Sequence, residues 1–196
     1  MNGLRDVLRV RDILHDLSAV DEAVYAAVAG TSTPALDHAM RQLSTAANHS
    51  KISLTTAGLL ALRPGRARRA ALRGTAAVAV ASATANLVGK QVVRRPRPIR
   101  AETMNPQRQV PMPGSTSFPS GHTASAFAFA YAVGSVLPAA GVPLGALALA
   151  VGYSRVHTGV HFPGDVAAGA LIGIASAAAV SAYGNRVDRP NPHVAG

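Results

Sequence analysis

The sequence is organised around residues 154–165, Ser-Arg-Val-His-Thr-Gly-Val-His-Phe-Pro-Gly-Asp, which separate two long runs without Lys, Arg, Asp or Glu. If a helix begins at or just before Asp165, the spacing of four residues lets its carboxylate accept a hydrogen bond from the ring of His161. That bond would fix the ring tautomer and leave the second nitrogen free to attack an electrophile. Arg155 adds a planar fork of donors that suits phosphate oxygens. The same stretch also fits a structural histidine beside a helix-capping aspartate.

Two other segments border apolar runs and favour the catalytic interpretation. Ser120 and Gly121 precede a long apolar run, so we expect them at a helix N-terminus, where free N–H groups and the helix dipole bind anions. His122 would then lie on the first turn of that helix. Further back, an apolar run ends at Lys90, and Arg97 follows seven residues later between two prolines.

Together the three segments resemble the signature of the type 2 phosphatidic acid phosphatase superfamily, which shares its core with the vanadium haloperoxidases. That signature reads Lys, six residues, Arg-Pro; then Pro-Ser-Gly-His; then Ser-Arg, five residues, His, three residues and Asp. Every position is matched here, by Lys90, Arg97, Pro98, Pro119, Ser120, Gly121, His122, Ser154, Arg155, His161 and Asp165. One part alone is a weak signal, whereas three in this order are highly specific. The resemblance covers residues 48–184.

The resemblance implies a role for each of these residues. His161 is expected to attack phosphorus and become a phosphohistidine, Asp165 to orient its ring, and His122 to protonate the leaving oxygen. The expected phosphate ligands are Lys90, Arg97, Ser120, Gly121 and Arg155. No metal or other cofactor is expected, because the chain after residue 108 contains only Asp165 and Asp188 as carboxylates. His157 is assigned a structural role, and His15, His38, His49 and His193 are assigned to the surface.

Composition points to a membrane protein. The chain has 196 residues, which is typical of one domain, and it contains no Cys, which excludes disulfides and thiolate metal sites. The formal net charge is +10, but the basic residues cluster at positions 63–73 and 90–108, next to apolar runs. This pattern fits a membrane protein better than a nucleic-acid-binding face.

The N-terminal region is predicted to form interfacial helices. Residues 1–16 alternate Arg and Asp and read as a solvated or headgroup-level start. Ser18 and Asp21 have the spacing of a capping box, which predicts a short amphipathic helix from Ser18 onward. A second helix is expected from Pro34. We therefore divide the chain into N-terminal amphipathic helices at 1–47, a membrane phosphatase core at 48–185 and a flexible tail at 186–196.

The core is predicted to be an all-α integral membrane bundle of about five transmembrane helices, with a sixth left open because relatives commonly have six. The expected helices lie at residues 52–62, 70–90, 123–137, 144–153 and 166–185. Residues 63–69 are expected to form a loop, and Pro138 to Pro143 to separate two helices. Gly169 and Gly173 have the spacing that lets helix backbones approach closely.

Orientation follows from the ends of these helices. Those that end at Lys90 and Arg155, and those that begin at His122 and near His161, must present these ends on one side. The Arg-rich loop at 63–73 then lies on the other side, and such loops are usually cytoplasmic. We therefore expect a multi-pass protein of the cell (plasma) membrane with its active site facing outside. The remaining nearby arginines are assigned to lipid headgroups: Arg94, Arg95 and Arg100.

The leading prediction is a lipid phosphatase that works at the membrane surface. The family's substrates include polyprenyl diphosphate, phosphatidate and phosphatidylglycerophosphate. The chain also resembles the phosphatase half that some bacteria fuse to a diacylglycerol kinase, which favours glycerolipids. Two alternatives from other classes stay open: a vanadate-dependent haloperoxidase-like enzyme, and a non-catalytic membrane protein that binds or transports phospholipid. The expected partners are a lipid phosphate and the bilayer, without nucleic acid, and the oligomeric state is left open.

Overall fold

The computed structural model describes residues 2–100, 102 and 104–188. Within these residues it contains helices and no strand: α1 (Asn2–Gly30), α2 (Pro34–Ala46), α3 (Lys51–Ala61), α4 (Arg66–Ala83), α5 (Lys90–Val92), α6 (Gly121–Val136), α7 (Pro138–His157) and α8 (Pro163–Val187). A π-helical turn, Thr84–Gly89, joins α4 to α5. The prediction of an all-α protein is therefore confirmed.

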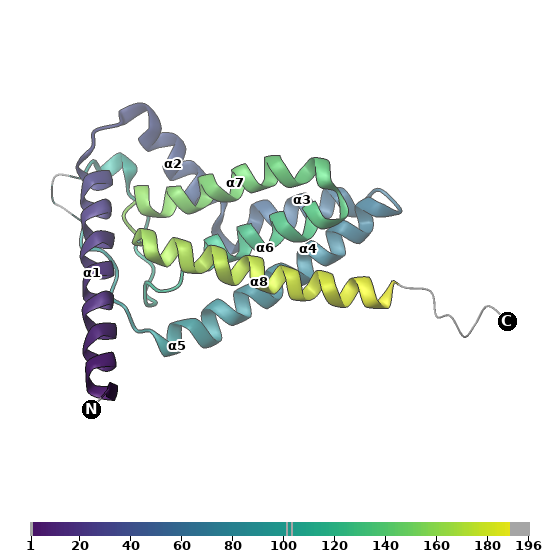
Figure 1. Cartoon of the computed structure of the whole chain (residues 1–196). Coiled ribbons are helices and arrows are strands. Elements are labelled where there is room, and N and C mark those ends of the chain that lie inside the picture. The colour runs from purple at the N-terminus through teal and green to yellow at the C-terminus, as the bar shows by residue number, and fades with distance from the viewer. Residues whose placement is uncertain (1, 101, 103, 189–196) are drawn as a thin grey trace.

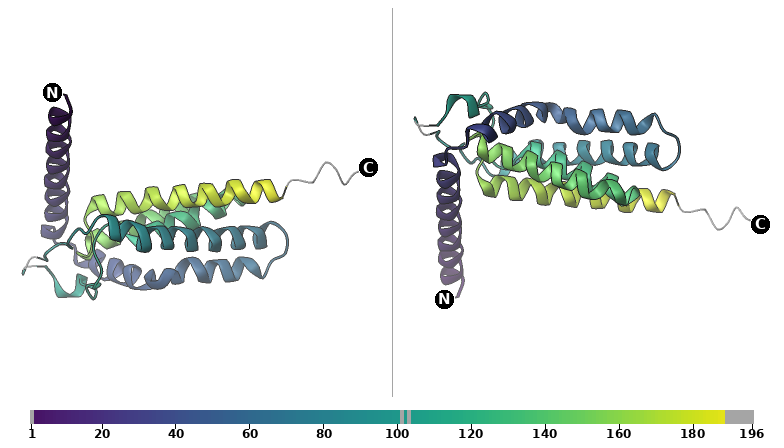
Figure 2. Two further views of the ribbon diagram at one scale, coloured as in Figure 1. Left: turned by 90° about the horizontal axis from the view of Figure 1, so that it is seen from below. Right: turned by 90° about the horizontal axis from the view of Figure 1, so that it is seen from above.

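Helices α3, α4, α6, α7 and α8 run alongside one another as a bundle, with α6 between α4, α7 and α8 (Figure 1). Three helical stretches are long and apolar enough to cross a membrane: Arg66–Val92, Pro138–His157 and Pro163–Val187. By contrast, α1 runs across one end of the bundle, as all three views in Figures 1 and 2 show. The N-terminal helix therefore does not add a further member to the bundle.

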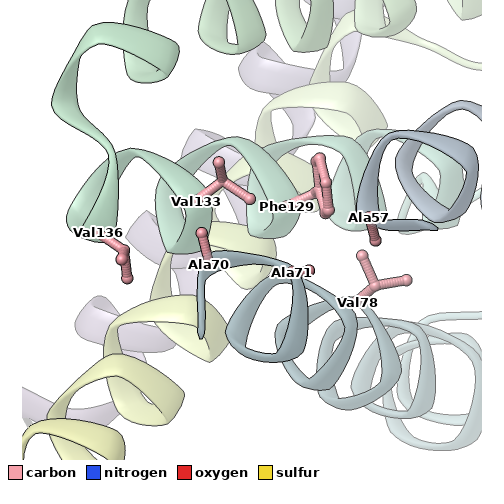
Figure 3. Packing of buried hydrophobic residues seen from close by; sticks show 7 residues of the cluster. All are labelled: Ala57, Ala70, Ala71, Val78, Phe129, Val133 and Val136. Carbon is pink, nitrogen blue, oxygen red and sulfur yellow. The ribbon is translucent and has the colours of Figure 1, made fainter. Parts of the chain in front are cut away.

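The core of the bundle is built from small side chains, as the Ala-rich sequence predicts. Ala70 and Ala71 of α4 face Phe129 and Val133 of α6, and all four are buried (Figure 3). A Cβ atom at Gly74 would come within 2.7 Å of the Phe129 ring. Such close approach lets dispersion and helix packing act where lipid gives little hydrophobic drive for helix association.

The predicted close approach at Gly169 and Gly173 is confirmed. A Cβ atom at either position would collide with a backbone carbonyl of α6, that of Ser120 or that of Ala124. The bare glycine face of α8 therefore lies directly against α6. As a result, the backbone N–H of Ser120 donates a 2.9 Å hydrogen bond to the carbonyl of Asp165, which ties two signature segments together.

Helix α1 differs from the prediction. The structure has one helix from Asn2 to Gly30, because residues 4–29 contain neither Gly nor Pro and propensity favours continuation. Ser18 lies inside this helix, so its predicted capping box with Asp21 is wrong. Asp21 instead accepts a 2.6 Å hydrogen bond from the backbone N–H of Gly164, at the start of α8. The carboxylate that the local pattern assigned to a helix cap therefore makes a tertiary contact instead.

Two further boundaries also differ. Helix α4 begins at Arg66, so the loop predicted to reach residue 69 is shorter; Arg66 donates a 2.7 Å hydrogen bond to the carbonyl of Val136 at the end of α6. Helix α7 begins at Pro138 and contains Pro143, so these prolines do not delimit a loop. Pro138 occupies the first helical position, where no N–H is needed, and packed neighbouring helices stabilise a proline inside a membrane bundle.

The C-terminal end of α8 is held more firmly than predicted. Arg186 and Val187 continue the helix, and Asp188 accepts a 2.7 Å hydrogen bond from Arg73 of α4. At residues 186–188 the structure thus differs from the flexible tail predicted at 186–196. The rest of it, residues 189–196 with His193, lies outside the described residues, as does the side chain of His15.

Candidate active site

A polar cavity of about 250 Å³ opens at the end of the bundle that α1 and α2 flank. It brings together all three signature segments. Its lining residues are His49, Ser50, Ser82, Asn86, Lys90, Arg97, Pro113, Ser115, Gly121, His122, Ser125, Arg155 and His161. Six of the eight predicted site residues therefore line a single cavity, although Lys90 and His161 are far apart in the sequence.

His161 lies in the short loop between α7 and α8, with its two ring nitrogens in different surroundings. Nδ1 lies 3.4 Å from the Oδ2 atom of Asp165, while Nε2 lies 3.4 Å from the Nη1 atom of Arg97 at the cavity. Helix α8 starts at Pro163, so Asp165 stands on its first turn, as the four-residue spacing predicts. A proton held on Nδ1 by the carboxylate leaves the electron pair of Nε2 free at the cavity.

Asp165 is fully buried and its carboxylate is held from several sides. Oδ2 accepts a hydrogen bond of 2.9 Å from the backbone N–H of Phe162 and another from the hydroxyl of Ser117. Oδ1 lies 3.4 Å from the Nη1 atom of Arg95. These bonds fix the carboxylate that in turn orients His161. Neither Ser117 nor Arg95 is part of the signature.

The ring of His161 is neutral at neutral pH. Burial lowers its pKa to about 4, and the positive charges of Arg97 and Arg155 act in the same direction against the opposing effect of Asp165. A neutral imidazole has a free electron pair on Nε2, which is the state that nucleophilic attack requires. We therefore expect the nucleophile to be active through the physiological range and to be lost by protonation below about pH 4.

Lys90 and Arg97 converge on Ser115 at the cavity. The Nζ atom of Lys90 donates a 2.9 Å hydrogen bond to the hydroxyl of Ser115. Arg97 donates from Nε to the carbonyl of Ser115 at 2.8 Å and from Nη1 to the carbonyl of Val160 at 2.6 Å. The backbone carbonyls fix the guanidinium, so little conformational entropy is left to lose when it binds an anion.

Arg155, in the last turn of α7, is buried and reaches the cavity from the other side. Its Nη1 atom donates to the hydroxyl of Ser44 at 2.6 Å, and its Nε atom has no hydrogen-bond partner among the residues that the structure describes. A buried, incompletely paired guanidinium at a polar cavity is suited to bind an anion. Ser44 lies on α2, which the signature does not reach.

The N-terminus of α6 is formed as predicted. Ser120 is the N-cap residue, its hydroxyl accepts a 3.5 Å hydrogen bond from the N–H of Thr123, and Gly121 lines the cavity. Ser120 itself is fully buried and is not among the lining residues. Its hydroxyl therefore caps the helix end in this structure, and the backbone N–H groups of the first turn beside Gly121 are the groups there that suit an anion.

His122, on the first turn of α6, faces a turn that no part of the signature includes. Its Nε2 atom lies 2.8 Å from the Oδ1 atom of Asn48. The next two residues, His49 and Ser50, both line the cavity and have left-handed backbone conformations with φ of 54° and 56°. Left-handed conformations in non-Gly residues are strained and cluster at functional sites. His49 is exposed, in keeping with its assignment to the surface, and it lines the cavity as well.

The assignment of Arg95 and Arg100 to lipid headgroups does not match the structure. Arg95 pairs with Asp21 at 2.5 Å, and Arg100 donates a 2.7 Å hydrogen bond to the carbonyl of Val110. Arg94 is exposed, as expected for a residue that contacts headgroups. A run of basic residues shows how many cations a segment has, but not which of their side chains point into the protein.

His157 lies in a buried network apart from the cavity. Its Nε2 atom is 2.9 Å from Asp37 of α2, and its Nδ1 atom is 3.3 Å from Arg108. Arg108 also donates to the carbonyl of Val28 near the end of α1 at 2.8 Å. This network ties the two N-terminal helices to α7, in keeping with the structural role assigned to His157.

Among residues 2–100, 102 and 104–188, no group of three or more His, Asp or Glu side chains is arranged to hold a metal ion. The positive charge in the cavity comes from Lys90, Arg97 and Arg155. Three cations and a helix N-terminus around one histidine nucleophile can stabilise the equatorial oxygens of a transferring phosphoryl group.

Comparison with known proteins finds a family and related phosphatases. The family model of the PAP2 superfamily matches residues 70–189. The chain is similar to the decaprenylphosphoryl-5-phosphoribose phosphatase of Mycobacterium tuberculosis, with 39% identity over 149 residues that cover 74% of this chain and 78% of that protein.

Solved structures agree on the fold. The PAP2-type phosphatidylglycerolphosphate phosphatase of Bacillus subtilis superposes with a TM-score of 0.71 and 24% identity over 90% of each chain. LpxE of Aquifex aeolicus superposes with a TM-score of 0.67 and 26% identity, covering 82% of this chain and 94% of that one. Because the family match spans the helices that carry the cavity, the chain belongs to the PAP2 superfamily and is a membrane enzyme that hydrolyses lipid phosphates.

Proposed function

We propose that the enzyme works through a phosphohistidine. The Nε2 atom of His161 attacks phosphorus, the N–P bond forms as the bond to the leaving oxygen breaks, and His122 gives that oxygen a proton. Burial and the nearby cations lower the pKa of His122 to about 3 without substrate, so the negative charge of the bound phosphate has to raise this pKa before His122 can act as the acid. Water then attacks the same phosphorus, His122 takes a proton from it, and the N–P bond breaks to release phosphate. The observation that carries this proposal is the position of His161, with Asp165 behind it and the cations of the cavity in front.

Lys90, Arg97 and Arg155 have a common task in this scheme. They hold the oxygens of the phosphoryl group while its negative charge is redistributed between the attacking nitrogen and the leaving oxygen. The backbone N–H groups at the start of α6 add a fixed partial positive charge. The family resemblance implies that Ser120 contacts the phosphate. Because its hydroxyl caps α6, we assign this contact to the backbone N–H groups at the start of the helix.

For the substrate we propose a phosphate monoester on a sugar that is linked to a polyprenyl phosphate. The relative with 39% identity is named for such a molecule. The cavity has a hydroxyl- and amide-bearing wall beyond the phosphate-binding cations, where Ser82 and Ser125 are 2.9 Å apart and Asn86 donates a 2.9 Å hydrogen bond to the carbonyl of Ser82. Polar side chains inside a membrane bundle are costly and usually functional. A hydroxyl-rich headgroup fits this wall better than a diacylglycerol does.

An apolar crevice beside the cavity supports the lipid part of the proposal. It lies between α3, α6 and α7 and is lined by residues such as Ile52, Phe129 and Leu147. Ser50, His122 and Ser125 line both the crevice and the polar cavity. The crevice is narrow, about 20 Å³, so a hydrocarbon chain would lie along its opening while the cations hold the phosphate and the polar wall contacts the sugar.

The test is phosphate release by the purified protein in detergent. The panel is decaprenylphosphoryl-5-phosphoribose, phosphatidate, phosphatidylglycerophosphate and a polyprenyl diphosphate, with His161→Ala as the blank. We expect the highest kcat/KM with the sugar-linked substrate. A higher kcat/KM with phosphatidate would exclude the proposed headgroup while leaving the lipid phosphatase activity intact.

We further propose that the protein lies in the plasma membrane with its active site outside. The loop between α3 and α4 lies at the opposite end of the bundle from α1 (Figure 1). It contains Arg63, and the first turn of α4 adds Arg66, Arg68 and Arg69. Loops rich in Lys and Arg usually stay in the cytoplasm. The active-site end would then face outward.

Thiol labelling in intact cells tests this orientation, and the natural chain has no Cys to interfere. Met112, exposed at the active-site end, and Arg63, exposed in the opposite loop, are each replaced by Cys. Arg63 is preferable to Gly65, whose φ of 76° would strain any other residue. We expect a membrane-impermeant reagent to label Met112→Cys and to spare Arg63→Cys. The reverse pattern would place the active site in the cytoplasm.

Activity is expected to persist in excess EDTA. The positive charge at the phosphoryl group is supplied by Lys90, Arg97 and Arg155, which a chelator cannot remove. Vanadate, which adopts the five-coordinate geometry of the transferring group beside a histidine, should inhibit. Loss of activity in EDTA that added Mg²⁺ restores would contradict the assignment of these cations as the complete phosphate-binding set. Bromide oxidation by the vanadate-loaded protein with peroxide would instead favour a haloperoxidase.

A further inference from the structure

Helix α1 contacts the catalytic loop through residues outside the family signature. Asp21 of α1 is buried, and its Oδ1 atom accepts a 2.6 Å hydrogen bond from the N–H of Gly164, the residue before Asp165. Tyr25, one turn further along α1, packs edge-on against Phe162 with ring centroids 5.5 Å apart. One face of α1 therefore lies directly on the segment that carries the nucleophile and its orienting carboxylate.

Arg95 is shared between this helix and the catalytic carboxylate. Its Nη1 atom lies 2.5 Å from the Oδ2 atom of Asp21 and 3.4 Å from the Oδ1 atom of Asp165. The guanidinium stacks over the ring of Phe162 at 3.9 Å from its centroid. Its Nη2 atom is buried without a hydrogen-bond partner among the described residues. One cation thus stands between two carboxylates, closer to the one that takes no part in the chemistry.

The two carboxylate oxygens of Asp165 have different partners. Oδ2 lies on the side of His161, at 3.4 Å from Nδ1, whereas Oδ1 lies on the side of Arg95. A guanidinium that paired fully with Asp165 would neutralise the carboxylate and weaken its hold on the ring. A guanidinium drawn toward Asp21 leaves more of that negative charge to His161. The position of Arg95 between them therefore affects the nucleophile through Asp165.

We propose that Asp21 and Arg95 are positioning residues for the His161–Asp165 pair, in which Asp21 draws Arg95 away from Asp165 and so sets how strongly this carboxylate acts on the nucleophile. The inference rests on the proposed phosphohistidine mechanism. It makes α1 part of the catalytic unit rather than only a helix at the membrane surface.

A structural alternative uses the same contacts, because Asp21 and Arg95 could simply fasten α1 to the bundle. The two roles differ in the sign of their effect on His161. The charged groups that face its ring come from several elements: Lys90 of α5, Arg97 of the segment that follows, His122 of α6, Arg155 of α7 and Asp165 of α8. None of these changes in the variants below, so any shift reports on Arg95 and Asp21.

The experiment compares pH profiles of kcat/KM for p-nitrophenyl phosphate in four proteins: wild type, Asp21→Asn, Arg95→Gln and Arg94→Gln. Attack requires neutral His161, so the acid limb of the profile follows its ionisation. Asparagine keeps an oxygen for the N–H of Gly164 and removes only the charge that holds Arg95. Arg94 is the exposed neighbour, and its replacement removes the same charge from the same segment.

The proposal predicts shifts of opposite sign. In Arg95→Gln a positive charge near Asp165 is lost, which stabilises the protonated ring of His161. The midpoint of the acid limb should therefore move to higher pH by about 0.5 unit or more. In Asp21→Asn the guanidinium of Arg95 is released toward Asp165, so the midpoint of the acid limb should move to lower pH. The kcat should drop by about tenfold with little change in KM. Arg94→Gln should match wild type.

A purely structural role predicts a different result. Loss of the contact between α1 and the loop before α8 would let water reach the His161–Asp165 pair. Water would relieve the desolvation of His161 and move the midpoint of the acid limb to higher pH in both Asp21→Asn and Arg95→Gln. Shifts in the same direction, or no shift, would therefore overturn the proposal. If Arg95→Gln does not fold in detergent by circular dichroism, Arg95→Lys takes its place: a limb at the wild-type position is expected when charge is what matters, and a raised limb contradicts it. Turnover that survives in His161→Ala would instead reject the underlying mechanism, so the two failures can be told apart.

Discussion

His161→Ala is expected to lower kcat/KM by about 10⁴-fold or more, whichever lipid phosphate is used, because the nucleophile that forms the covalent bond is lost. The bound substrate would still be held by the cations of the cavity, so KM should change far less than kcat. Neither of the other lining histidines can take over directly, because only His161 combines a buried carboxylate on Nδ1 with an Nε2 atom beside Arg97. The measurement is phosphate release together with acid-quench trapping of labelled phosphoprotein.

Two controls make the result interpretable. Arg94→Ala alters an exposed residue outside the signature and should keep wild-type rates within about twofold. His161→Ala should also bind vanadate more weakly than wild type while keeping its thermal unfolding midpoint. A phosphoprotein that is still trapped in His161→Ala would show that another residue is the nucleophile.

The second large effect is expected for His122→Ala, and its size should depend on the leaving group. For an alkyl phosphate, whose leaving oxygen needs a proton, the loss of general acid catalysis should cost about 10²- to 10⁴-fold in kcat/KM. For p-nitrophenyl phosphate, whose leaving oxygen is stable as an anion, the loss should be about tenfold or less. The measurement is kcat/KM against a series of phosphates that differ in leaving-group pKa.

Asn48→Ala separates protonation from general disturbance of the cavity. It removes the partner that lies 2.8 Å from Nε2 of His122 without removing the imidazole. We expect a smaller loss than in His122→Ala, with the same dependence on the leaving group. Equal losses on good and poor leaving groups in His122→Ala would exclude His122 from the role of the acid.

The predicted site residues that the structure brings together share a local basis. The distance from His161 to Asp165 is one helical turn, so a helix starting at Pro163 is enough to bring them together. Gly121 and His122 follow a capping serine, and Lys90 ends an apolar run. In each case the chemistry depends on a spacing of a few residues or on the end of one helix, which the sequence states directly.

The residues that were missed act over long separations. Ser44 and Asn48 reach Arg155 and His122 from the α2–α3 region, and Ser117 and Arg95 reach Asp165 from the loop before α6. Asp21 was assigned to a local cap but contacts α8 instead. Serine, asparagine and aspartate are common in turns and caps, so no periodicity marks the few that a fold brings to an active site.

The sequence by itself determined the fold class, the three signature segments and the side of the bundle on which they meet, because apolar runs must cross the bilayer and their charged ends must leave it. Only the tertiary structure decided which side chains surround those segments. The course of α1 across the end of the bundle depends on Asp21, Tyr25 and Arg95 meeting the α8 loop, and the close contact of α8 with α6 depends on the bare face at Gly169 and Gly173. These contacts stabilise the fold only once the helices are packed, since each joins groups that are distant in the chain and have no reason to meet before packing.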